Sequence, residues 1–184
     1  MRLIVLVAVA LLAAACQRLE EADNIAPGCD ARAANTWAVG DAQYSVEAST
    51  DGPDCARAVA TIVVRDASGV PLYAEAHLAN HLMTLAPATT EAAMQTALAD
   101  WSNPANNTTM QTTSALPDWP QGEAAPQNGE FPFYPEPGYD RDTYMAIRAE
   151  NAPLLCYVQG MESTSCLALR NGALEKIGVQ AFPG

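Results

Sequence analysis

Apolar and polar residues alternate in several short stretches of the chain, and a period of two residues is typical of a half-buried β-strand. Residues 43–48 put Tyr44, Val46 and Ala48 on one face. Residues 58–64 are apolar at nearly every position, which predicts a central strand buried on both sides. Residues 70–78 alternate again, and the side chains expected to point inward are Val70, Leu72, Ala74, Ala76 and Leu78. With turn signals between them, these stretches predict an antiparallel meander.

Two later segments have the apolar spacing of amphipathic helices. The first helix is expected to start at a cap on Thr89 and to end before Asn103-Pro104, and the second to start at a cap on Asp140 or Asp142. Three further strands are expected at 154–158, 167–170 and 176–181, with Asn171-Gly172 as a hairpin turn. We therefore expect an α+β fold: an antiparallel sheet of five to six strands with two helices and a long loop rich in proline and aromatic residues. A β-sandwich with two helices is the alternative.

Residues 106–138 contain six prolines and few aliphatic residues. A segment this long without regular structure is often functional or disordered. Prolines lower its unbound entropy, and aromatic rings offer contact area at small ordering cost. The predicted interaction surface therefore consists of Trp119, Phe131, Phe133, Tyr134 and Tyr139. The alternative is that Trp119, Phe131 and Phe133 only pin the loop onto the sheet.

The amino terminus has the layout of an export signal. Met1-Arg2 precede an unbroken apolar run from 3 to 15, and acidic polar sequence follows Cys16. A helix of that run spans about 20 Å, which is shorter than the bilayer core of about 30 Å. We expect residues 1–15 to be a signal peptide, 16–28 the processed amino terminus and tether, and 29–184 a single globular α+β domain.

The sequence Leu12-Ala13-Ala14-Ala15-Cys16 resembles the lipobox of bacterial lipoproteins. The resemblance covers this precursor segment only, and it implies that Cys16 carries a diacylglycerol thioether and an acyl chain such as palmitate. Gln17 stands where retention in the inner membrane favours Asp, which implies an outer-membrane anchor facing the periplasm. Ala13 occupies the usual place of a leucine, so ordinary signal cleavage after Ala15 is the alternative.

Four cysteines remain after Cys16: Cys29, Cys55, Cys156 and Cys166. An even number in an exported domain predicts two disulfides, although four cysteines allow three connectivities. We expect Cys29–Cys55 and Cys156–Cys166, because each pair is close in sequence and flanks its own strand region. A zinc site is disfavoured, since no CxxC motif or cysteine–histidine cluster occurs.

The chain carries a formal charge of −12, from 21 acidic and 9 basic residues. Such a charge repels nucleic acid and attracts a basic partner. His77 and His81 are four residues apart, but they form no HExxH motif, and the alternation of 70–78 places His77 on a strand. No GxSxG elbow or phosphate loop is present either. We expect no catalytic residue, metal or cofactor.

Together these patterns predict a non-catalytic lipoprotein of the cell envelope with a structural or interaction role in the periplasm. Its expected partners are the membrane, through the lipid anchor, and either a basic protein or a cell-wall component. A first alternative is an inhibitor of a basic extracellular enzyme, because an acidic disulfide-bonded lipoprotein is similar in broad properties to the membrane-bound lysozyme inhibitors. A second alternative is a small hydrolase without a recognisable motif.

Overall fold

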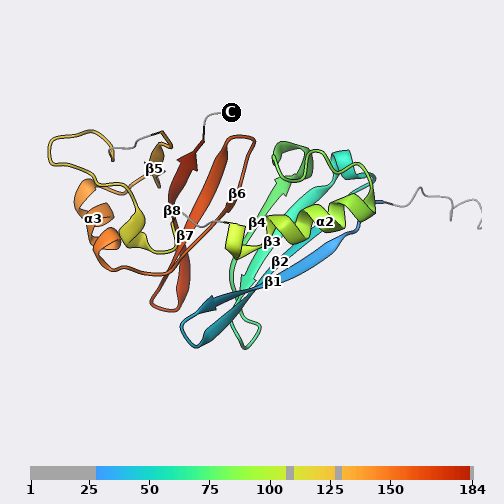
Figure 1. Ribbon diagram of the computed structural model, residues 1–184, viewed down its shortest axis with the longest axis horizontal. Coiled ribbons are helices and arrows are strands. Elements are labelled where there is room, and N and C mark those ends of the chain that lie inside the picture. The colour runs from blue at the N-terminus through green and yellow to red at the C-terminus, as the bar shows by residue number, and fades with distance from the viewer. Residues whose placement is uncertain (1–27, 107–109, 127–129, 183–184) are drawn as a thin grey trace, which may run out of the picture.

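The computed structural model describes residues 28–106, 110–126 and 130–182, which form two antiparallel sheets and two α-helices (Figure 1). The predicted α+β class is confirmed. The strand count of five to six is wrong, because these residues form eight strands, four in each sheet. The predicted signal peptide, Cys16 and most of the tether lie outside the described residues.

The first sheet is the predicted meander with one additional strand. Its order is β1-β2-β3-β4, and the strands are β1 (Arg32–Val39), β2 (Ala42–Asp51), β3 (Val59–Arg65) and β4 (Pro71–Leu78). The extra strand is β1, which was not predicted because half of its eight residues are alanine or asparagine, which have low strand propensity.

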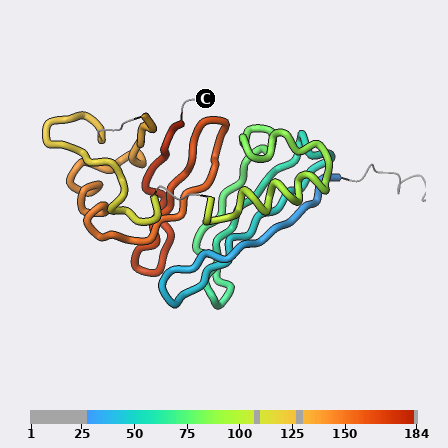
Figure 2. The backbone as a smooth tube through the Cα atoms, viewed as in Figure 1, coloured from blue at the N-terminus to red at the C-terminus, as the bar shows by residue number. Residues whose placement is uncertain are grey.

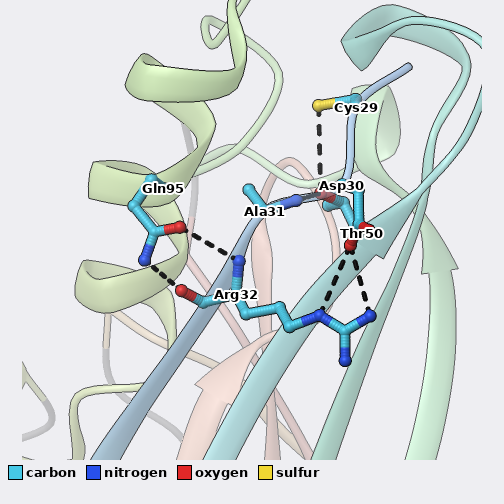
Figure 3. A network of polar contacts seen from close by, with 6 residues as sticks. All are labelled: Cys29, Asp30, Ala31, Arg32, Thr50 and Gln95. Carbon is cyan, nitrogen blue, oxygen red and sulfur yellow. Dashed lines mark hydrogen bonds and ion pairs between the residues drawn. The ribbon is translucent and has the colours of Figure 1, made fainter. Parts of the chain in front are cut away.

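Helix α2 (Glu91–Trp101) packs along the β1 side of this sheet with Met94, Leu98 and Trp101 buried. Its N-cap is Thr90 rather than Thr89, since the Thr90 side chain accepts a hydrogen bond from the backbone of Ala93. The side-chain amide of Gln95 accepts from the backbone N–H of Arg32 and donates to its carbonyl, as a neighbouring strand would (Figure 3). The helix therefore closes part of the exposed edge of β1.

The second sheet has the order β5-β8-β7-β6. Its strands are β5 (Phe133–Pro135), β6 (Leu154–Val158), β7 (Ser163–Arg170) and β8 (Ala173–Ala181). Asn171 and Gly172 form the predicted turn, with φ values of 51° and 78° that fit a type I′ hairpin. Helix α3 (Arg141–Ala149) is capped by Asp140, as one of the two predicted caps, through a 2.8 Å hydrogen bond from the Thr143 backbone.

The second sheet is buried on both faces and links two clusters of core residues. One face packs with α2 and the first sheet through Leu155, Tyr157, Leu167 and Leu174. The other face packs with α3 through Leu154, Cys156, Cys166, Ala168 and Ile177. As a result, the carboxyl-terminal half of the chain lies beside the amino-terminal half (Figure 2). In the described part of the chain, no helix is long and apolar enough to cross a membrane.

Both predicted disulfides are confirmed. Cys29 and Cys55 are 4.9 Å apart at their Cα atoms and join the chain before β1 to the short helix η2 (Cys55–Arg57). Cys156 and Cys166 lie directly opposite each other on β6 and β7, with a Cα–Cα distance of 4.1 Å. In the chain-entropy model each closed loop contributes about 3 kcal/mol of stability.

Two predictions about strand faces are wrong. β3 is buried on one face only, because Ala60, Ile62 and Val64 point inward while the side chain of Val59 is 42% exposed.

In β4 the apolar side chains of Ala74, Ala76 and Leu78 point outward, and the polar set between them points inward. The cause is a bulge at Leu72, which is skipped between two successive pairs of the ladder. An extra residue in one strand moves every following side chain to the opposite face.

Candidate functional site

The loop before α3 is fixed to that helix by three hydrogen bonds from side chains to main-chain carbonyls. Arg148 Nε donates to Leu116 O at 2.8 Å, and the Tyr144 hydroxyl donates to Pro117 O at 2.9 Å. Arg141 Nε donates to Trp119 O at 2.7 Å. These three donors lie on one side of the helix, so α3 sets the path of residues 116–119.

Two of the predicted interaction residues hold the loop in place. The Trp119 ring meets Tyr144 edge-on at 5.6 Å between centroids, and its indole N–H donates to Glu123 O at 2.8 Å. Phe133 is fully buried and lies 6.1 Å from the same tyrosine ring. Tyr139 is partly buried against this cluster. For these residues the geometry favours the pinning role.

The other two predicted residues face solvent. Phe131 and Tyr134 are 46% and 57% exposed. Tyr134 lies on β5, the edge strand of the second sheet, where it pairs with Val179. The carbonyl of Pro132, which lies between these two residues in sequence, accepts a 2.8 Å hydrogen bond from the backbone N–H of Ala181. We call Phe131 and Tyr134 the aromatic edge.

A glycine allows β5 to approach its neighbour this closely. A Cβ atom on Gly178 would lie 2.4 Å from the Tyr134 carbonyl oxygen and 2.6 Å from the Phe133 ring. Any larger residue there would have to push β5 away from β8. The position of the aromatic edge thus depends on Gly178.

The sequence around the aromatic edge is uniformly acidic. Residues 66–140 contain no lysine or arginine, and residues 110–140 contain five carboxylates: Asp118, Glu123, Glu130, Glu136 and Asp140. Arg141, which follows, already binds Trp119 O and the carboxylate of Asp142. Exposed aromatic faces and carboxylates both attract cations. The charge of this segment and the two exposed rings therefore each suit a basic group.

A second cluster of polar and aromatic side chains joins the two sheets. The hydroxyl groups of Tyr73 on β4 and Tyr157 on β6 both donate to the carboxylate of Glu75 on β4. The two hydroxyl oxygens are also 2.9 Å from each other. We call these three residues with His77 the inter-sheet joint. The joint was not predicted, because the alternation in residues 70–78 places Tyr73, Glu75 and His77 on the solvent face.

The protonation states at the joint are set by burial and by these hydrogen bonds. Burial opposes the charge on Glu75, but the hydrogen bonds from Tyr157 and Tyr73, together with nearby Lys176 and His77, outweigh it and lower the pKa of Glu75. Burial and the contact with Glu75 raise the pKa of both tyrosines. At neutral pH a carboxylate is therefore held by two neutral phenols. General acid–base catalysis needs a pKa near the working pH, so this arrangement suits a clamp better than proton transfer.

The two histidines lie in different surroundings. His77 points into the joint with its side chain 13% exposed, whereas His81 is exposed at the end of the short helix η3 (Ala79–His81). Within the described ranges, no group of three or more His, Cys, Asp or Glu side chains could hold a metal ion.

No protein-family model, curated protein or solved structure matches this chain.

Proposed function

We propose that the chain is a non-catalytic lipoprotein of the cell envelope that acts by binding another protein through the aromatic edge. The observation that carries this proposal is the exposure of Phe131 and Tyr134 on a backbone held by β8. Large rings on a fixed backbone bury much area on binding and lose little entropy, which is typical of residues that dominate binding energy.

Two features support the location in the envelope. Residues 12–16 resemble a lipobox, which fits lipidation of Cys16 and an anchor in the outer membrane facing the periplasm. The two disulfides fit an oxidising compartment, where such bonds persist.

The inter-sheet joint supports a role without catalysis. It gathers Glu75, Tyr73 and Tyr157 in one place, but their pKa values are displaced away from neutrality. The carboxylate is already bonded to both phenols, and these bonds connect two sheets. Its chemistry therefore favours holding the fold together.

An inhibitor of a basic extracellular enzyme is the second candidate. The observation in its favour is the absence of lysine and arginine from residues 66–140 beside five carboxylates in residues 110–140. Opposite charges would steer a basic enzyme toward this surface. Adding the full chain in molar excess to lysozyme tests the candidate, because an inhibitor would lower the rate of cell-wall hydrolysis and a simple binding protein would not.

The main proposal is tested by capturing partners from envelope extract on the immobilised full chain. We expect the double substitution Phe131→Ala with Tyr134→Ala to abolish the capture of a specific protein while leaving the melting temperature unchanged. The matched control is Val59→Ala with Leu78→Ala, which removes two apolar side chains of the first sheet that are 42% and 47% exposed. Equal capture by the two double variants would contradict the proposal.

A further inference from the structure

His77 lies where three elements from both halves of the molecule meet. Its ring packs edge-on against the rings of Trp101 on α2 and Tyr157 on β6. The distances between ring centroids are 6.0 Å and 6.1 Å. Its own strand, β4, belongs to the first sheet and Tyr157 to the second. Any change at this imidazole therefore acts on the contact between the two sheets.

The surroundings of the His77 imidazole disfavour its protonated form. Its Nε2 atom is buried and finds no hydrogen-bond partner among the described residues. The nearest carboxylate oxygen, Glu75 Oε2, is 3.9 Å away, which is beyond hydrogen-bond distance. A protonated ring would carry an N–H group without an acceptor, and burying such a group costs free energy.

We propose that the inter-sheet joint is a pH-responsive contact, which weakens when the imidazole of His77 gains a proton. This inference goes beyond the proposed function and concerns a different site from the aromatic edge. The responsive element is the packing of β4 against β6, and protonation favours arrangements in which water reaches the ring.

Charged and titratable groups face His77 from each neighbouring element. From β4, Glu75 attracts the charged ring, but its carboxylate is already shared by the phenols of Tyr73 and Tyr157. From β8, Lys176 repels it, and from α2 the neutral ring of Trp101 offers no counter-charge. Burial is the largest influence and lowers the pKa of His77, Glu75 acts in the opposite direction, and Lys176 adds to the lowering.

The lowered pKa of His77 determines how folding stability changes with pH. In the unfolded chain a histidine titrates at about 6.5, and in the folded chain His77 titrates lower. The folded state therefore binds fewer protons just below the unfolded value. Stability is complete above the unfolded pKa and falls as the pH decreases through it, until the folded pKa is passed.

The chain contains only two histidines, which provides a matched control. Chemical unfolding of the full chain is measured at about pH 7.5 and about pH 5.5, a window that brackets the histidine value. We expect the wild type and His81→Gln to lose stability on acidification, and His77→Gln to lose measurably less. The same loss in all three proteins would overturn the proposal.

A second measurement covers the case in which His77→Gln does not fold. In the His81→Gln chain the imidazole of His77 is the only one left, and its proton resonances can be followed by NMR. We expect a titration midpoint below that of an unfolded histidine, together with shifts of the Trp101 and Tyr157 ring signals over the same pH range. A midpoint at or above the unfolded value would overturn the inference.

Discussion

The hydroxyl group of Tyr157 donates a hydrogen bond to the carboxylate of Glu75, and this bond joins β6 of one sheet to β4 of the other. Tyr157→Phe keeps the ring and removes the donor. We expect the free energy of unfolding to fall by about 1 kcal/mol, because the partly exposed carboxylate can recruit water in place of the phenol. Tyr134→Phe, on the solvent-facing edge strand, is the control and should leave the denaturation midpoint unchanged. Equal losses of stability in the two variants would contradict the role of the Tyr157 hydroxyl in the inter-sheet joint.

The pKa of Glu75 makes the contribution of the inter-sheet joint to folding stability depend on pH. Because that pKa is lower in the folded chain than the unfolded value of about 4.3, the contribution of Glu75 is complete above the unfolded value and is lost as the pH falls through the folded one. We expect the stability difference between wild type and Glu75→Gln to shrink between about pH 5 and about pH 3. Glu123→Gln, in the exposed part of the loop, serves as the reference. A pH-independent difference for Glu75→Gln would contradict the assignment.

Gly178→Ala tests how β5 is held. The new Cβ atom would meet the Tyr134 carbonyl and the Phe133 ring, so β5 must shift and stability should fall by about 1–3 kcal/mol, the usual cost of overpacking. Gly160→Ala is the control, since its Cβ atom would meet only the mobile end of Ser163, at 3.0 Å. Thermal melts of both variants measure the effect. A Gly178→Ala protein as stable as the Gly160→Ala control would show that β5 does not have to shift to accept a Cβ atom at position 178.

Trp119→Ala separates pinning from binding. Its ring packs on Tyr144 and its N–H bonds to Glu123 O, so we expect a loss of about 1–3 kcal/mol, less than for a fully buried tryptophan. Phe131→Ala should change stability by less than about 0.5 kcal/mol, as is usual for surface sites. If Trp119→Ala leaves the melting temperature unchanged and Phe131→Ala lowers it, the two roles have been assigned the wrong way round.

Features fixed by local chemistry could be predicted from the sequence. The Asn171-Gly172 turn requires two residues that tolerate positive φ, and the Asp140 cap requires a short acceptor at a helix start. The disulfide pairs followed from proximity in sequence. In each case the determining residues lie near one another along the chain.

Features that depend on distant partners could not be predicted. The bulge at Leu72 leaves no local mark in the sequence, yet it reverses the faces of β4 and creates the inter-sheet joint. β5 forms because Gly178, more than 40 residues later, lets Phe133 approach. Proline and aromatic content marked the loop as a candidate surface, but only packing against Tyr144 separates Trp119 from the exposed Phe131.

The central claim, that the aromatic edge binds a protein, is tested most directly by site-specific photo-crosslinking in cells that produce the full chain. A photoreactive residue is placed at Tyr134, at Phe131 and, as a control, at Thr36, which is exposed on β1 of the other sheet. We predict that the first two positions give a crosslinked product with the same protein and that Thr36 does not. Absence of any product at Tyr134 and Phe131, or the same product at Thr36, would contradict the account.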